Sequence, residues 1–425
     1  MHDAFDQGFY VLVTGANGGL GLAICCRLID EYLATIQAPR SIHLIFTTRS
    51  HQKGSDTVTS VQRHIHNRGV DTSRVFLQPE ILDLTSLHSI RKLSSKLLSS
   101  LPRLDALILN AGSGGFTGVD WGAAIWAVTT DFLHALTWPG FKKNGVGFLT
   151  GIQLGSGAQE PPLGEVFCSN VFGHYFLSHQ VMSLLSASST SEDTRGRIIW
   201  VSSVEAIGPS FTIHDLQGLR SQDAYGSSKR LTDLLALTAH LRSTQTFVSR
   251  FLTAPTPTRS SPTSSTIPTT APRIFLTHPG VCATSIVPLI MVASWAMAAA
   301  FYMARLLGSS IHTVTPYAGA LAPVWIALRP QAELDDMEQS YGVAKWGSAT
   351  DLWGRGHIER TEVDWWGYSG VRGETIERRR VRRRGTIDVT DEARKDFEEV
   401  GRECWREMEA LREEWELLLD MTKSS

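Results

Sequence analysis

The sequence lacks the features that mark secreted, metal-binding or nucleic-acid-binding proteins. Its 425 residues include five cysteines, an odd number, and the only close pair, Cys25 and Cys26, is adjacent in sequence. This arrangement gives neither a disulfide framework nor a metal-ligand spacing, and it favours a reducing compartment. We expect no nucleic-acid partner, because a formal net charge of −2 implies no domain-wide basic surface. We also expect no secretory signal, because the N-terminus is polar and acidic.

Charge is missing from one long internal stretch. No Asp, Glu, Lys or Arg lies between Arg273 and Arg305, so residues 286–304 form an uncharged run just long enough to span a bilayer. Pro288 and the many alanines weaken the spanning interpretation. Three alternatives stay open for the larger apolar segment 281–328: a transmembrane helix, a surface that lies on a membrane, or a buried helix pair that lines an apolar pocket. The composition favours membrane contact.

A glycine-rich turn follows the first expected strand and opens a helix pattern. Its glycines allow a tight turn and close approach of the backbone to a phosphate, which the free N–H groups of the helix start would bind. Because the turn lies between a strand and a helix, it predicts a dinucleotide site. The expected cofactor residues of this turn are Gly15, Asn17, Gly19, Leu20 and Gly21.

Apolar runs of strand length alternate with helix patterns through most of the chain. This alternation predicts an α/β fold, a Rossmann-type doubly wound parallel sheet with helices on both faces. Ligands of such sheets bind at the carboxyl ends of the strands, and there we expect Asp83, Asn110, Pro279 and Gly280 to border the cofactor. The expected strands are residues 9–14, 41–48, 75–82, 104–109, 196–201 and 273–277.

The residue after the second expected strand bears on the choice of cofactor. A site for NAD usually has a carboxylate there to hold the ribose 2′-hydroxyl, whereas this chain has Arg49. A guanidinium suits a 2′-phosphate, so Arg49 favours NADPH. The alternative is an arginine of a solvated loop.

A tyrosine and a lysine four residues apart, Tyr225 and Lys229, lie on one face of an expected helix. A nearby ammonium lowers the pKa of a phenol and makes it a usable proton donor. Ser203, at the end of the strand 196–201, can donate a hydrogen bond to a substrate carbonyl, with Ser202 as its rival. Asn170 lies in an otherwise apolar helix at 165–185, either as a core amide or as the holder of a water.

The remaining segments divide the chain. Residues 1–330 are predicted to form the Rossmann-type domain, and residues 331–425 a C-terminal extension with an amphipathic helix at about 391–420 that docks on the body or on a partner. Residues 113–164, rich in glycine and aromatics, form either a substrate-side cover or an insert packed on the core. The Pro/Ser/Thr-rich residues 253–273 are a flexible insert or a translated intron. The arginines of 378–384 form a solvated loop or a contact with anionic lipid.

Together these residues resemble the short-chain dehydrogenases/reductases from residue 11 to about 328. The motifs that carry the resemblance are the glycine turn, Asn110-Ala111-Gly112, the Asn170, Ser203, Tyr225 and Lys229 set, and Pro279-Gly280. More narrowly, residues 165–175, SSKRLTDLLALT and THPGVCATSI resemble the fungal 3-keto-steroid reductases of ergosterol synthesis, a branch similar to vertebrate 17β-hydroxysteroid dehydrogenase type 7.

The resemblance implies NADPH-dependent reduction of the C3 ketone of a sterol during C4 demethylation. It implies work beside the other C4-demethylation enzymes at the endoplasmic reticulum membrane or lipid droplets, with the catalytic domain facing the cytosol. Tyr225 would donate the proton, Lys229 would lower the tyrosine pKa and bind the nicotinamide ribose, Ser203 would polarise the ketone and Asn170 would hold a relay water. The alternatives are another lipophilic ketone, such as a 17-keto steroid or a retinoid, and a membrane scaffold for sterol enzymes.

Overall fold

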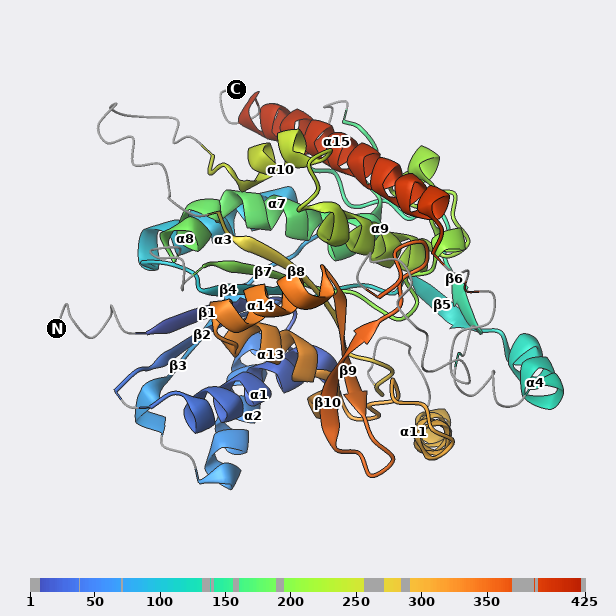
Figure 1. The fold of residues 1–425 in the computed structure, drawn as a ribbon. Coiled ribbons are helices and arrows are strands. Elements are labelled where there is room, and N and C mark those ends of the chain that lie inside the picture. The colour runs from blue at the N-terminus through green and yellow to red at the C-terminus, as the bar shows by residue number, and fades with distance from the viewer. Residues whose placement is uncertain are drawn as a thin grey trace.

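Figure 1 shows the chain in a computed structural model. The structure describes residues 8–37, 39–69, 72–131, 138, 141–155, 160–188, 195–255, 271–283, 291–368, 386 and 389–421. The arginine clusters of 378–384 lie outside these residues, and so does most of the predicted insert 253–273. The expectations for those two segments therefore stay predictions.

The centre of the molecule is a sheet of eight strands in the order β10-β9-β8-β7-β4-β1-β2-β3 (Figure 1). Neighbouring strands run parallel, except that β10 pairs antiparallel with β9. The strands are β1 (Phe9–Val13), β2 (Ile42–Thr48), β3 (Val75–Ile81), β4 (Ala106–Leu109), β7 (Arg197–Val201), β8 (Arg273–His278), β9 (Lys345–Thr350) and β10 (Gly356–Thr361). The predicted Rossmann-type sheet is confirmed.

Successive residues of the central strands point to opposite faces of the sheet, and both faces are buried. In β1, Tyr10 and Leu12 belong to one apolar cluster, and Val11 and Val13 belong to the other. Strands that are buried on both faces consist of continuous apolar residues, and such runs can be recognised in the sequence.

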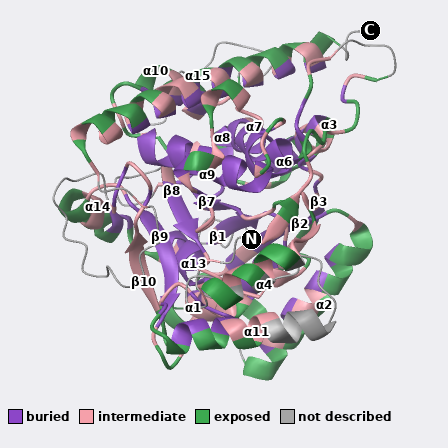
Figure 2. Cartoon of the chain, turned by 90° about the vertical axis from the view of Figure 1, so that its right-hand side faces the viewer, coloured by how far each residue is buried: buried purple, intermediate pink, exposed green. Residues whose placement is uncertain are grey.

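Helices cover both faces of the sheet (Figure 1). On one face lie α1 (Gly19–Thr35), α2 (His51–Arg68), α12 (Pro316–Gly319), α13 (Leu321–Leu328) and α14 (Gln331–Tyr341). On the other lie α3 (Leu87–Ser100), α6 (Glu165–Phe167), α7 (Gly173–Gln180), α8 (Met182–Ala187), α9 (Ala224–Thr238), α10 (Gln245–Leu252) and α15 (Asp391–Met421). Short helical turns are η1 (Thr72–Arg74), η3 (Gly208–Ser210) and η4 (Ile213–Asp215). Figure 2 shows that buried residues concentrate in the sheet and in α7 and α9, while α15 and α2 expose their outer faces.

The sheet extends beyond the domain boundary predicted at residue 330. Strand β9 pairs with β8 through Leu276↔Lys345, so the chain returns to the sheet after α14. Residues 345–361 of the predicted C-terminal extension therefore belong to the central sheet.

The helix predicted at 165–185 is interrupted. A π-helical turn, η2 (Cys168–Phe172), separates α6 from α7, and a further break at Val181 separates α7 from α8. Such turns insert one residue into the helical repeat and often lie at functional sites. Asn170 is in the middle of this turn.

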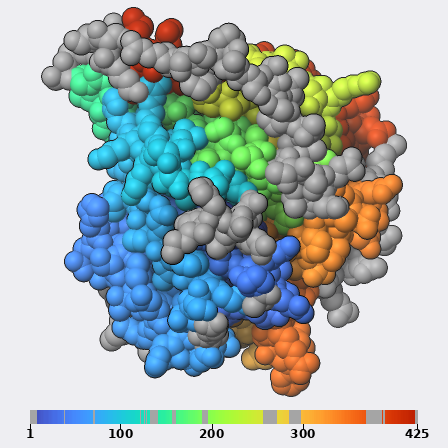
Figure 3. Space-filling view, turned by 90° about the vertical axis from the view of Figure 1, so that its left-hand side faces the viewer, coloured from blue at the N-terminus to red at the C-terminus, as the bar shows by residue number. Residues whose placement is uncertain are grey.

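Residues far apart in sequence meet on the face of the sheet that carries α1. The hydroxyl of Tyr317, in α12, donates a hydrogen bond to the carboxylate of Asp30 (2.6 Å), and the Arg27 guanidinium donates to the Tyr317 carbonyl (3.0 Å). In Figure 3 the N-terminal part, in blue, lies against later residues in orange. This contact fixes the segment after α11 against the first helix.

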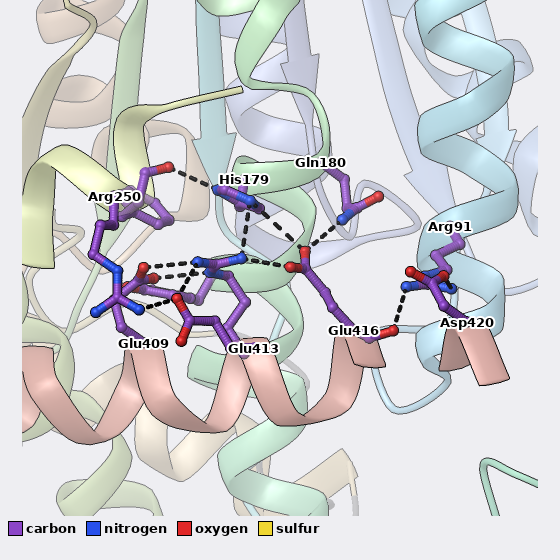
Figure 4. A network of polar contacts seen from close by, with 11 residues as sticks. Arg91, His179, Gln180, Arg250, Glu409, Glu413, Glu416 and Asp420 are labelled. Carbon is purple, nitrogen blue, oxygen red and sulfur yellow. Dashed lines mark hydrogen bonds and ion pairs between the residues drawn. The ribbon is translucent and has the colours of Figure 1, made fainter. Parts of the chain in front are cut away.

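Helix α15 is held on the body by a buried polar network (Figure 4). Glu409 is fully buried and accepts hydrogen bonds from Tyr175 of α7 (2.6 Å) and from Arg412 of its own helix (2.8 and 2.9 Å). Arg412 also contacts His179 of α7, with 3.0 Å between nitrogens. Buried apolar residues add to the contact, so α15 docks on the body of this chain; they are Phe397, Cys404, Trp405, Met408, Trp415 and Leu419.

The apolar segment contributes α11 (Met291–Leu306), which lies beside the β9–β10 hairpin in Figure 1. Across the described part of the chain, no helix combines the length and the apolar character needed to cross a membrane. The spanning alternative thus finds no support there, while residues 284–290 lie outside the description.

Residues 113–164 are an elaboration of the core. They include a two-stranded antiparallel hairpin, β5 (Phe116–Val119) and β6 (Lys142–Asn144), and the helix α4 (Trp121–Thr130). The hairpin lies at the end of the molecule that carries α4 and α11 (Figure 1). The cavity described below is bordered by this segment.

Candidate active site

One cavity of about 820 Å³ opens at the carboxyl ends of the strands. Nearly all of the predicted site residues line it, which brings together positions spread over more than 260 residues of sequence. The predicted residues that line it are Gly15, Asn17, Gly19, Leu20, Gly21, Arg49, Asp83, Asn110, Ser203, Tyr225, Lys229, Pro279 and Gly280. Asn170 does not line it.

The turn between β1 and α1 needs its glycines. Gly15 has φ +71°, and a Cβ there would lie 2.8 Å from Ala111. A Cβ on Gly21 would lie 2.1 Å from the Gly15 carbonyl oxygen. Neither Gly15 nor Gly21 could therefore carry a side chain, and the turn leads into the N-terminus of α1, where anions are stabilised.

Asn110 serves this turn from the neighbouring strand. Its side-chain amide donates to the Thr14 carbonyl (3.0 Å), and its backbone N–H donates to the Thr14 hydroxyl (2.9 Å). Asn110 thus braces the glycine turn from the floor of the cavity. Asp83 holds its own loop in a similar way, because its carboxylate accepts hydrogen bonds from the Thr85 backbone (3.0 Å) and hydroxyl (2.7 Å).

Arg49 follows β2 and is exposed at the rim of the cavity. Thr48, just before it, is buried and donates from its hydroxyl to the Ser50 carbonyl (2.9 Å). The strand end is thereby fixed while the guanidinium stays available to an anion.

Tyr225 and Lys229 lie on the first two turns of α9, whose start is capped by Asp223 (2.9 Å to the Gly226 N–H). Both side chains are buried. The Lys229 Nζ donates to the Val201 carbonyl (2.8 Å) and lies 5.8 Å from the centroid of the Tyr225 ring. The pair predicted from the spacing therefore faces the cavity from one side of the helix.

The surroundings of this pair set its pKa values. Burial raises the pKa of Tyr225 above its ordinary value, Glu205 raises it further, and a hydrogen bond with Ser203 lowers it. Burial lowers the pKa of Lys229 to about 8, although Asp233 acts in the opposite direction. The net direction for Tyr225 is upward because burial outweighs the charges around the phenol, and the expectation that Lys229 lowers this pKa stays a prediction.

The two candidate serines are separated by their contacts. The hydroxyl of Ser202 donates to the buried carboxylate of Asp233 (2.5 Å). The hydroxyl of Ser203 is hydrogen-bonded with Tyr225 and accepts from the Glu205 N–H (3.1 Å). Ser203 is therefore the serine that can contact a substrate carbonyl beside the phenol.

Asn170 is a fully engaged amide. Its side-chain oxygen accepts from the Ser113 N–H (2.7 Å), and its amide nitrogen donates to the Ser113 carbonyl and the Ser228 hydroxyl (2.9 Å each). The side chain thus joins the loop after β4 to α9, one residue before Lys229. This placement ties the Asn170 side chain into the core, and its role as the holder of a relay water stays a prediction.

Several residues of the site could not be identified from the sequence. Lys142 and Glu205 form an ion pair in the cavity, with Lys142 contributed by the 113–164 segment. Lys345, at the start of β9, donates to the carbonyl of Ser203 (2.7 Å) and pairs with Asp233. These charged residues lie in segments that contain no recognisable sequence motif. Only the tertiary fold brings them to the site.

Comparisons with known proteins point in one direction. No protein-family model matches the sequence. A 3-keto-steroid reductase of Aspergillus fumigatus is 48% identical over 97% of this chain and 95% of its own length. The 3-keto-steroid reductase of Gibberella zeae is 36% identical over 99% of this chain and 96% of its own.

Solved structures give more distant similarities. A complex named Pseudomonas aeruginosa RhlG/NADP active-site complex is 19% identical, covers 77% of this chain and 92% of its own, and has a TM-score of 0.43. Salutaridine reductase from Papaver somniferum is 18% identical, with coverage of 76% and 96% and a TM-score of 0.41.

Proposed function

The chain belongs to the fungal 3-keto-steroid reductases, and from that membership we propose that it reduces the C3 ketone of a 4-methyl 3-keto sterol to the 3β-alcohol with NADPH. The family resemblance predicted from the sequence is confirmed. The observation that carries the proposal is the meeting of Tyr225, Ser203 and Lys229 in one cavity, in a chain related to these reductases over nearly its full length. The reaction would serve C4 demethylation in ergosterol biosynthesis.

The residues divide the reduction between them. The glycine turn and the N-terminus of α1 fit a dinucleotide phosphate, because Gly15 and Gly21 leave no room for a Cβ and the turn lines the cavity. When bound, the nicotinamide supplies the hydride that goes to the ketone carbon. Tyr225 donates its proton to the ketone oxygen, Ser203 donates a hydrogen bond to the same oxygen, and Lys229 stabilises the phenolate that remains.

Arg49 supports the choice of NADPH over NADH. We expect Arg49→Gln to raise the Kd for NADPH about 10- to 100-fold, because a charge-assisted contact to the 2′-phosphate is lost. The Kd for NADH should change less than about threefold. Both constants can be measured by fluorescence titration of the purified protein. Equal losses for the two cofactors would show that Arg49 does not read the 2′-phosphate.

The apolar segment suits a sterol. Met297, Ala300 and Phe301 of α11 line the cavity, and the same helix exposes Tyr302, Met303 and Leu306. Leu306 is 70% exposed, and Trp353 in the β9–β10 turn is 85% exposed. The helix and the turn are neighbours, because a Cβ on Gly354 would lie 2.7 Å from the Arg305 guanidinium. We propose that this apolar rim (Tyr302, Met303, Leu306, Leu307, Leu352 and Trp353) rests on a bilayer, from which the sterol enters.

The rim can be tested with vesicles. Leu306→Ser combined with Trp353→Ser should weaken co-sedimentation with phosphatidylcholine vesicles about tenfold or more, because two exposed apolar side chains are lost. Activity in detergent should stay within about twofold. The matched control is Leu417→Ser with Met421→Ser, which removes exposed apolar side chains of α15. A control that weakens binding equally would contradict the assignment of this surface.

Location and partners complete the proposal. A rim of this kind suits the cytosolic face of the endoplasmic reticulum membrane or of a lipid droplet, and it would place the reductase beside the other C4-demethylation enzymes. Immunogold labelling and cross-linking in fungal cells would test both points.

The function is tested by NADPH oxidation with purified protein, detergent and a 4-methyl 3-keto sterol, with the alcohol identified by gas chromatography and mass spectrometry against 3α and 3β standards. Stoichiometric formation of the 3β-alcohol is the expected result. Turnover of a 17-keto steroid or of retinal alone would transfer the proposal to another lipophilic carbonyl compound. NADPH binding without turnover of any ketone would favour a membrane scaffold.

A further inference from the structure

Tyr225 has a second lysine beside it, from a segment with no recognisable motif. Lys142, on β6, pairs with the carboxylate of Glu205, and its Nζ lies 4.9 Å from the centroid of the Phe116 ring. The Phe116 and Tyr225 ring centroids are 5.4 Å apart. The small hairpin thus places an aromatic ring and an ammonium next to the Tyr225 ring.

The two lysines are equally distant from the phenol. The Nζ atoms of Lys142 and Lys229 each lie 5.8 Å from the centroid of the Tyr225 ring. Lys229 is buried and donates to Val201, whereas the side chain of Lys142 is 24% exposed and that of Glu205 is 36% exposed. The Lys142–Glu205 pair is therefore the part of the site that substitution can change with little effect on the core.

The charges that face Tyr225 come from four elements. Lys142 comes from β6, Glu205 from the loop after β7, Asp223 and Lys229 from the cap and body of α9, and Cys282, a thiol that burial keeps neutral, from the loop after β8. Burial is the largest influence that raises the pKa of Tyr225, and Glu205 is the largest of the charged ones. Asp223 is occupied by the Gly226 N–H and the Ser210 hydroxyl (2.9 and 2.7 Å). Glu205 is thus the carboxylate whose effect on the pKa of Tyr225 depends on its ion pair with Lys142.

We infer that Lys142 is a positioning residue for the reduction: its ammonium neutralises Glu205 and so keeps Tyr225 able to donate its proton to the ketone. The inference rests on the proposed function. A carboxylate left unpaired next to a buried phenol would repel the phenolate that forms as the proton leaves. The ammonium of Lys142 removes that repulsion, and it also attracts the phenolate directly.

The inference predicts opposite effects of the two halves of the pair. Lys142→Met leaves Glu205 unbalanced, so the pKa of Tyr225 should rise by about half a unit to one unit. Glu205→Gln leaves Lys142 unbalanced, so that pKa should fall by a similar amount. The double variant should return close to the wild-type value. Lys142→Arg keeps the charge and should behave as wild type.

The measurement is the pH profile of the reverse reaction, oxidation of the 3β-hydroxy sterol by NADP⁺, in which the phenolate is the base. Below the pKa of Tyr225 the rate rises with pH, so this rising limb should move to higher pH in Lys142→Met and to lower pH in Glu205→Gln. At neutral pH the reduction should be about 3- to 10-fold slower in Lys142→Met, following the smaller acidity of the phenol. The matched control is Lys143→Met, from the same strand, whose lysine pairs with Asp120 (3.5 Å).

The outcomes separate this inference from the proposed function. Equal losses in both single variants, an unshifted rising limb and no recovery in the double variant would overturn it and leave the pair as a brace of the hairpin. A wild-type protein that leaves the sterol unchanged would overturn the proposed function instead. The pair would then be tested by ultraviolet difference titration of the tyrosine against Tyr225→Phe, where the same opposite shifts are expected and their absence would contradict the inference.

Discussion

Replacement of Tyr225 by phenylalanine is expected to lower kcat for the sterol ketone by about 10²- to 10⁴-fold, the contribution typical of a positioned proton donor. The hydride acceptor becomes an alkoxide, and without the phenol no group at the ketone oxygen can supply a proton, because Ser203 is too weak an acid. The ring itself packs against Phe116 at 5.4 Å between centroids, a contact that phenylalanine keeps. NADPH binding and the melting temperature should therefore stay close to wild type.

Single-turnover kinetics with saturating NADPH would measure this effect free of product release. The control is Tyr175→Phe, which removes a buried tyrosine hydroxyl far from the ketone, where it donates to Glu409 (2.6 Å). This control should lose stability but keep kcat within about threefold. A Tyr225→Phe protein with more than about a tenth of the wild-type kcat would contradict the assignment of Tyr225 as the acid.

The site residues that could be predicted belong to patterns that span only a few residues of sequence. The glycine turn needs close backbone approach, as the 2.1 Å distance between a Cβ on Gly21 and the Gly15 oxygen shows. Tyr225 and Lys229 meet because the helical repeat brings residues four apart to one face. Each of these two patterns spans only a few neighbouring residues, so it can be recognised from the sequence alone.

The parts that were missed depend on contacts between distant segments. Lys345 reaches the Ser203 carbonyl only because β9 adds to the sheet after α14, and no pattern near residue 345 indicates that pairing. Lys142 reaches the cavity through a two-stranded hairpin in a segment whose glycines and aromatics mask the strand pattern. The interruption at Asn170 was hidden because a π-turn keeps the apolar character of the helix around it.

The electrostatic balance at Tyr225 was also beyond the sequence. Spacing shows that a lysine is near the phenol, but the sign of the net pKa shift depends on burial and on Glu205. Desolvation of the charged form can outweigh a neighbouring ammonium, particularly one that already donates to a carbonyl. The fold of the site was therefore more predictable than its protonation.

The buried ion pair next to Ser203 gives the second large expected effect, which is on stability. Lys345 and Asp233 lie 2.6 Å apart, with 3% and 0% of their side chains exposed. Lys345→Met should lower the free energy of unfolding by about 3–5 kcal/mol, because it leaves a buried carboxylate without its cation. Urea unfolding of the cofactor-free protein would measure the loss. Lys345→Met combined with Asp233→Leu should recover most of it, since the pair is then replaced by apolar groups.

The loss in Lys345→Met should also depend on pH. Burial raises the pKa of Asp233, and Lys345 and the Ser202 hydroxyl lower it, so removal of the lysine raises it further. A carboxyl whose pKa is higher in the folded than in the unfolded state favours folding when protonated, and this contribution disappears as the pH rises through the folded-state pKa. The deficit should therefore shrink as the pH falls towards about 4, the ordinary range of an aspartate.

An exposed pair offers the control: Arg329 and Glu333 are 2.8 Å apart and about half exposed, so Arg329→Ala should change stability by less than about 1 kcal/mol. If the deficit in Lys345→Met is as small as that in Arg329→Ala and does not change with pH, then solvent reaches Asp233. Lys345 would then not hold the loop that begins at Ser203.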